Sequence, residues 1–134
     1  MKSNTRITKL YSYQLHRIIT LATEWCVQNF GVRKYCPTFD LDLVRDTKKE
    51  DLGWYLAARH DPKITINLAQ NTHVLELIDT VIHEYTHYLA HNFMEVYTQF
   101  ETDNSYKQHP LEIEACQQAK QYRRKCFTDI KKLF

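Results

Sequence analysis

The segment from residue 73 to residue 93 constrains the fold of this chain more than any other. Its apolar residues recur at helical spacing, so we expect a central, largely buried helix with Asn71 or Thr72 as its N-cap. The apolar stripe consists of Val74, Leu75, Leu77, Ile78, Val81, Ile82, Tyr85 and Leu89. Residues 83 to 87 read His-Glu-Tyr-Thr-His, which places two histidines one helical turn apart on one face.

This His-Glu-x-x-His pattern is typical of a metal centre that activates water. Because His83 and His87 lie on one helix face, both imidazoles can reach one zinc ion, and Glu84 can reach a water molecule on that ion. Burying unpaired histidines is costly, and metal ligation removes that cost. A catalytic zinc ion usually has three protein ligands, so a further ligand must come from another segment.

The third ligand is expected near the start of a second helical segment, which begins at Pro110 and has an apolar stripe up to Ile130. Glu112 and Glu114 are about 200° apart on such a helix, so only one of them can face the metal. Glu114 is the predicted ligand, assigned to the inward face, whereas Glu112 is expected to point more toward solvent or to support a ligand. His109 is the alternative ligand, or else a donor to the substrate's oxyanion.

The remaining segments predict an α+β fold. Residues 9–30 have a helical stripe of apolar residues, and Gly31 is placed to end this helix. Strands are expected at residues 39–44, 52–58 and 64–68. Because a short turn separates the last two strands, we expect a hairpin within a small, three-stranded, mostly antiparallel sheet. Residues 1–134 are expected to form a single domain, in which a C-terminal helix supplies the third ligand.

Composition and charge exclude several classes of protein. The chain has 134 residues, 43% of them hydrophobic, with only two glycines and three prolines, which argues against a disordered or repetitive protein. No segment has the pattern of a signal peptide or a membrane span, so we expect a cytoplasmic protein, with virion association as an alternative. A net charge of +2 is too small to indicate a nucleic-acid partner. The four cysteines lack C-x-x-C spacing and are expected to be reduced.

The order and spacing of these motifs resemble the gluzincins, the thermolysin-type peptidases in which His-Glu-x-x-His is completed by a glutamate that precedes alanine. In this chain the corresponding residues are His83, Glu84, His87 and the pair Glu114-Ala115. A closer likeness is to small intracellular or phage-encoded zincins of the ImmA/IrrE or minigluzincin type, and it covers roughly residues 52–125. The resemblance implies a zincin-like fold, zinc ligands at both histidines and Glu114, a general base at Glu84, and a strand edge before the motif helix that can accept an extended peptide.

The chain departs from the thermolysin-like pattern at Gln118, where those enzymes place an aspartate that orients a ligand histidine. Asp79, one turn before His83, is the expected substitute. Tyr106, like His109, is a candidate for stabilising the charge that develops on the substrate's carbonyl oxygen.

The leading functional hypothesis is therefore a zinc metallopeptidase. Zinc would polarise the scissile carbonyl and acidify a water molecule, and Glu84 would accept the proton of that water. The alternative is a zincin fold without catalysis, retained as a structural or binding component of a phage particle or a regulatory complex. The expected partner is a peptide or protein substrate, and a second protein could complete the cleft.

Overall fold

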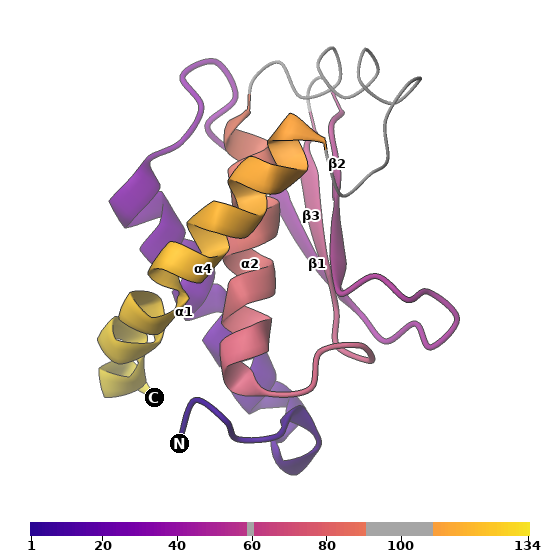
Figure 1. Cartoon of the computed structure of the whole chain (residues 1–134), viewed down its shortest axis with the longest axis vertical. Coiled ribbons are helices and arrows are strands. Elements are labelled where there is room, and N and C mark those ends of the chain that lie inside the picture. The colour runs from indigo at the N-terminus through magenta and orange to yellow at the C-terminus, as the bar shows by residue number, and fades with distance from the viewer. Residues whose placement is uncertain (59–60, 91–108) are drawn as a thin grey trace.

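The computed structural model describes residues 1–58, 61–90 and 109–134 and shows the predicted α+β fold (Figure 1). The helices in these ranges are α1 (Ser12–Phe30), α2 (Val74–Leu89) and α4 (Pro110–Ile130), with short 3-10 helices η1 (Ile7–Lys9) and η3 (Lys131–Leu133). The strands are β1 (Asp40–Val44), β2 (Gly53–Leu56) and β3 (Lys63–Asn67). Each predicted helix and strand is therefore present, with shifted ends.

The three strands form a mixed sheet in the order β1-β3-β2. β2 and β3 pair antiparallel, with Trp54 opposite Thr65, which confirms the predicted hairpin. β1 and β3 pair in parallel, with Leu43 opposite Ile66, so the prediction of a mostly antiparallel sheet is wrong. The reason is the strand order: the chain reverses direction after each strand, and inserting β3 between the first two gives it one parallel neighbour.

The strand order also changes which strand has a free edge. The family resemblance implied that the strand before the motif helix, β3, is an edge, but β3 is paired on both sides. Its residues Ile64, Thr65, Ile66 and Asn67 are all buried, as expected for the central strand. Within the described residues, the edge strands are β1 and β2.

The central element of the fold is α2. In Figure 1 the sheet lies on one side of α2, and α1 and α4 pack on its other sides. Its N-cap is His73, whose Nδ1 accepts a hydrogen bond from the backbone N–H of Glu76, and not the predicted Asn71 or Thr72. The side chain of Asn71 instead binds the loop that leads into β2, as described next. The helix ends at Leu89, earlier than the predicted end at residue 93.

Two buried asparagines hold the loop before β2 against the sheet and α2. Asn67 donates to the carbonyl oxygen of Asp46 (2.9 Å) and accepts from the backbone N–H of the same residue (3.0 Å). Asn71 donates to the carbonyl oxygen of Leu52 (3.0 Å) and accepts from the hydroxyl of Thr80 on α2 (2.7 Å). These amides bind backbone groups of the loop, and they hold the start of β2 beside α2.

Gly53, the first residue of β2, lies too close to α2 for any side chain. A Cβ at this position would be 2.8 Å from the carbonyl oxygen of Thr65, 2.9 Å from Thr80 Cγ2 and 3.3 Å from Glu84 Cγ. Glycine is therefore required by the close approach of the β3 backbone and of two side chains of α2. As a result, the first residue of an edge strand borders the predicted general base.

The first and last helices follow the predicted pattern. α1 ends at Phe30 and is followed by Gly31 at a φ of 79°, which favours glycine.

All four cysteines are free, as expected. In the described part of the chain, none of the helices combines the length and the apolar character needed to span a bilayer.

Candidate metal centre

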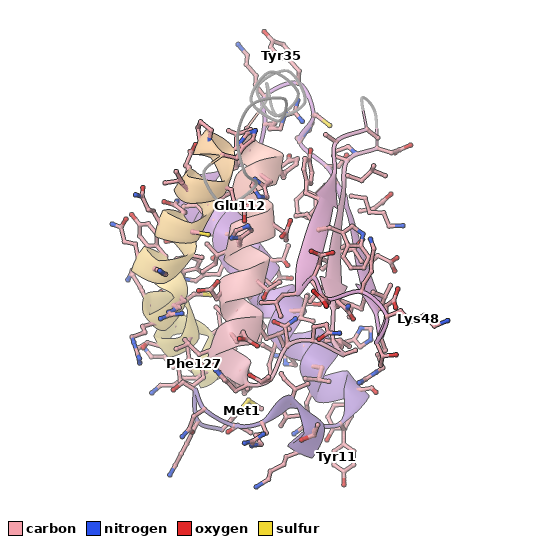
Figure 2. All side chains as sticks on the ribbon, turned by 45° about the vertical axis from the view of Figure 1, so that its right-hand side comes forward. Met1, Tyr11, Tyr35, Lys48, Glu112 and Phe127 are labelled. Carbon is pink, nitrogen blue, oxygen red and sulfur yellow. The ribbon has the colours of Figure 1, made fainter. Side chains whose placement is uncertain are left out.

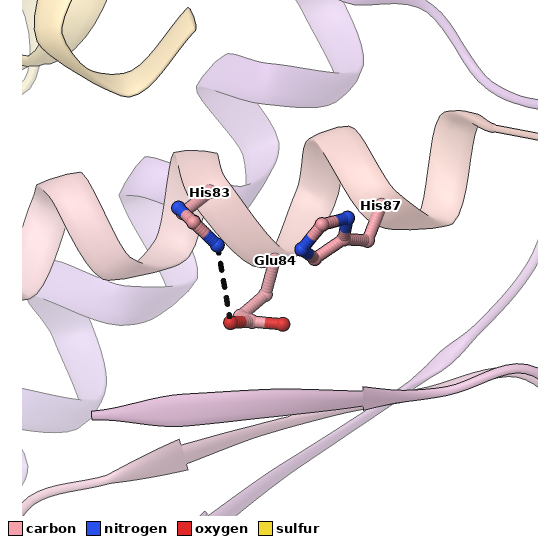
Figure 3. Close-up of side chains that lie close together, drawn as sticks. All are labelled: His83, Glu84 and His87. Carbon is pink, nitrogen blue, oxygen red and sulfur yellow. Dashed lines mark ion pairs between the residues drawn. The ribbon is translucent and has the colours of Figure 1, made fainter. Parts of the chain in front are cut away.

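The three fixed residues of the motif converge on the side of α2 that faces the sheet (Figure 3). The imidazole rings of His83 and His87 have centroids 4.9 Å apart. His83 Nε2 lies 4.0 Å from Glu84 Oε1. The helical spacing therefore brings two imidazoles and a carboxylate together, as the sequence predicted.

A fourth side chain reaches this cluster from α4, and it belongs to Glu112. Its two carboxylate oxygens lie 2.8 Å from His83 Nε2 and 3.1 Å from His87 Nε2. Figure 2 labels Glu112 where α4 passes beside α2. Glu112 is 8% exposed, whereas Glu114 is on the exposed side of α4. The prediction that Glu114 faces the histidines is therefore wrong.

Helix geometry explains why Glu112 faces inward. The buried residues that define the inward face of α4 include Ala115, Ala119, Cys126 and Ile130. At 100° per residue, their mean direction lies about 30° from that of Glu112 and about 130° from that of Glu114. This apolar face determines how α4 is rotated about its own axis. That rotation turns Glu112, and not Glu114, toward the histidines.

The four side chains, which we call the His-Glu cluster (His83, Glu84, His87 and Glu112), fit a zinc ion. Two imidazole nitrogens and one carboxylate are the protein ligands of a well-known class of catalytic zinc site. Ligand atoms about 2 Å from one tetrahedral ion lie roughly 3.3 Å from one another. The distances from Glu112 to the two Nε2 atoms are close to this separation, so small shifts would admit an ion.

Glu84 is a buried carboxyl group that is only partly satisfied by hydrogen bonds. The residue is 5% exposed, and its Oε2 has no hydrogen-bond partner among the described residues. Burial raises the pKa of Glu84 to about 8; the neighbouring Glu112 carboxylate also raises it, and His83 acts in the opposite direction. In the metal-free protein, Glu84 is therefore mostly protonated at neutral pH.

His83 and Glu112 shift the pKa of each other in opposite directions. Burial alone would lower the pKa of His83, but its hydrogen bond with Glu112 and the nearby carboxylates raise it above the ordinary value. Burial alone would raise the pKa of Glu112, but hydrogen bonds from both histidines lower it below its usual range. Without a metal, the hydrogen bond between His83 and Glu112 therefore favours the charged form of each side chain, and a metal ion would have to compete with a proton for the ligating nitrogen of His83.

These shifts predict how the stability of the metal-free protein depends on pH. Below about pH 4.5, Glu84 is protonated in both the folded and the unfolded chain. Between about pH 4.5 and pH 8, only the unfolded chain releases this proton, so rising pH favours unfolding. We expect Glu84→Gln to remove this loss of stability. Relative to the wild type, the free energy of unfolding of the variant should rise by up to about 5 kcal/mol across that pH range.

Denaturant unfolding in the presence of a chelator, repeated from about pH 5 to pH 8, measures this difference. Glu114→Gln is the matched control, because it removes one carboxylate from an exposed position of α4. Its stability relative to the wild type should vary little with pH. A difference between Glu84→Gln and the wild type that stays constant across the range would contradict the prediction.

A pocket of about 180 Å³ opens beside the cluster. Its lining includes Asp51 and Leu52 from the loop before β2, Gly53 at the start of β2, and Asp79, Thr80, His83, Glu84 and Glu112 from the helices. This volume can hold several water molecules or one substrate side chain. No motif in the sequence marks the start of β2 as part of the site, although an isolated glycine within a strand pattern is a signal of close backbone approach.

Asp79, His109 and Tyr106 are the remaining predicted residues. The Oδ2 atom of Asp79 pairs with Arg123 at 3.1 Å, and the negative charge of Asp79 is one of the causes that raise the pKa of His83. His109 is buried at the N-cap of α4, where its Nδ1 accepts from the backbone N–H of Leu111. His109 is not among the described residues that line the pocket. Tyr106 lies outside the described residues.

Comparison with models of protein families, with curated proteins and with solved structures finds no match for this chain. The chemistry of the His-Glu cluster therefore has to carry the functional assignment. Its His83, Glu84 and His87 bring three potential ligand atoms within 4.8 Å of one another, close enough to hold a metal ion.

Proposed function

We propose that this protein is a zinc-dependent metallopeptidase with a zincin-like fold. His83, His87 and Glu112 would hold the zinc ion, and Glu84 would act as the general base. The observation that carries the proposal is the position of Glu112, which faces the Nε2 atoms of both histidines from a separate helix. Two histidines and a glutamate leave one coordination position for water, whereas structural zinc sites are closed by four protein ligands.

A zinc ion bound here would supply a Lewis acid for the scissile carbonyl and lower the pKa of a water molecule. The residues of the chain have distinct roles around it. Glu84 is among the residues that line the pocket, so its carboxylate can accept a proton from the attacking water. The water oxygen bonds to the carbonyl carbon, the C–N bond breaks, and Glu84 returns the proton to the leaving amine.

The burial of Glu84 suits this role. A general base is most effective when its pKa lies near the working pH, and burial moves the pKa of Glu84 in that direction. β2 borders the pocket through its first residue, Gly53, and it has only one neighbour in the described sheet. Its outer edge can therefore pair with an extended peptide, a role that the resemblance assigned to β3.

The test is to measure the zinc content of the purified protein and its action on a peptide library, with cleavage products identified by mass spectrometry. We expect one zinc ion per chain, and cleavage that is lost with a chelator and restored by zinc. His83→Ala should lose both metal and cleavage. A wild-type protein without zinc contradicts the proposal, and zinc binding without cleavage of any peptide would support the non-catalytic alternative.

A further inference from the structure

An exposed cysteine of α4, Cys116, lies beside the His-Glu cluster. His83, Glu112 and Cys116 each offer one ligand atom, and these three atoms lie within 4.8 Å of one another. Glu112 and Cys116 are four residues apart, so they lie on one face of α4. We call these three residues the thiol set, and His83, His87 and Glu112 the zinc set. The two sets share His83 and Glu112.

The spacing within the thiol set suits a single ion. A sulfur and a nitrogen bound to one tetrahedral zinc ion lie roughly 3.6 Å from each other. Cys116 Sγ lies 3.8 Å from His83 Nδ1, which is close to that separation. Because Cys116 is exposed, an ion can approach its sulfur from solvent without any opening of the core.

The two sets differ in one donor. The zinc set contains the imidazole of His87, and the thiol set contains the sulfur of Cys116 in its place. Thiolate ligands select soft cations, whereas imidazole and carboxylate donors suit borderline and harder ones. A neutral imidazole has one free lone pair, so His83 can bind only one ion at a time. The two sets therefore compete for His83.

We propose that the thiol set is an alternative binding site for soft divalent cations such as Cd²⁺, and that its occupation excludes zinc from the zinc set. An ion in the thiol set would occupy two of the three residues that hold zinc, so it would stop peptide cleavage by displacing zinc. In this respect the thiol set rests on the proposed function, whereas the binding of Cd²⁺ through Cys116 requires neither zinc nor catalysis.

The experiment titrates the full-length, metal-free protein with Cd²⁺ and follows the ultraviolet charge-transfer absorption of a cadmium–thiolate bond. Competition with a chromophoric chelator gives the dissociation constants of Cd²⁺ and of Zn²⁺. We expect Cys116→Ser to remove the absorption and to weaken Cd²⁺ binding roughly 100-fold, the upper value for supporting contacts of a metal ligand. Its zinc affinity should equal that of the wild type, because the zinc set is intact. Serine keeps the size of the side chain and replaces only the soft donor atom.

Three further variants show which residues act with the sulfur. His83→Ala should weaken the binding of both metals, because both sets contain His83. His87→Ala should weaken zinc binding and leave the cadmium absorption in place. Cys36→Ser is the matched control: Cys36 is also outside the core, but its sulfur contacts the carbonyl oxygen of Thr38 and belongs to neither set.

Three results would overturn the thiol set. The first is Cd²⁺ binding that does not respond to Cys116→Ser. The second is Cd²⁺ binding that depends on Cys116 but is unchanged in His83→Ala, because the sulfur would then act alone. The third is an equal loss of zinc and Cd²⁺ affinity in Cys116→Ser, because the two sets would then not be distinct.

Failure of the thiol set and failure of the proposed function give different results. A protein that binds Cd²⁺ through Cys116 and His83 but binds no zinc supports the thiol set as a cation site, and it contradicts both the zinc metallopeptidase and the displacement of zinc. A protein that binds zinc and cleaves peptides, but whose Cd²⁺ affinity is unchanged in Cys116→Ser, supports the proposed function and overturns the thiol set. In the zinc-loaded wild type, added Cd²⁺ should release the bound zinc, and Cys116→Ser should prevent this release at the same Cd²⁺ concentration.

Discussion

We expect replacement of Glu112 with glutamine to weaken zinc binding by roughly 100-fold or more, and the same replacement of Glu114 to leave zinc binding unchanged. Removing supporting contacts of a metal ligand typically costs 10- to 100-fold, and loss of an anionic ligand should cost at least the upper value. The glutamine at position 112 keeps the size of the side chain but loses the negative charge that faces both histidines. Comparing the two variants therefore tests both the effect of the negative charge and the effect of its position on α4.

Competition with a chromophoric chelator at constant pH measures zinc binding by both variants, and circular dichroism verifies that their total helical content is unchanged. Glu114→Gln is a stringent control, because it makes the same chemical change two residues away on the same helix. The opposite outcome, with zinc lost in Glu114→Gln and kept in Glu112→Gln, would show that the ligand predicted from the family resemblance is the right one. If neither variant loses zinc, α4 does not supply a ligand to the metal centre.

Replacing Glu84 with glutamine is expected to lower kcat/KM for a cleaved peptide by roughly 100- to 10,000-fold, which is the range for loss of a general base. Zinc should remain bound, because His83, His87 and Glu112 are unchanged. Glutamine preserves the shape of the side chain against Gly53 but cannot accept the proton of the attacking water.

Steady-state kinetics and zinc stoichiometry, measured on the same preparation, separate the two effects. Glu114→Gln again serves as the control for removing one carboxylate. If Glu84→Gln cleaves peptides at the wild-type rate with zinc bound, the carboxylate is not the base. If it loses zinc along with cleavage, Glu84 is part of the metal-binding set.

The sequence was sufficient to predict the helices and the convergence of the motif residues, because both follow from local periodicity. The choice between Glu112 and Glu114 was also within reach of the sequence. Leu111 and Ala115 alone do not distinguish the two glutamates. The apolar positions further along α4 define the inward direction.

Other features depend on long-range pairing, which the sequence pattern does not encode. The strand patterns predicted a hairpin, but they contained no information on whether β3 would pair on its second side with β1. The role of Asp79 was assigned from its spacing to His83 alone. Its partner, Arg123, lies 44 residues further along the chain and becomes adjacent only when α4 packs on α2.

The placement of Glu112 on α4 also has a consequence for how the chain is held together. His87 and Glu112 are 25 residues apart, and an ion bound by both would cross-link two helices that are otherwise joined by packing and a few polar contacts. Closing a loop of this length restricts the unfolded chain by about 3.5 kcal/mol in the chain-entropy treatment of disulfides. In a chain whose four cysteines are all free, a metal ion would serve as a reversible bridge, and the concentration of free zinc would set how tightly α2 and α4 are joined.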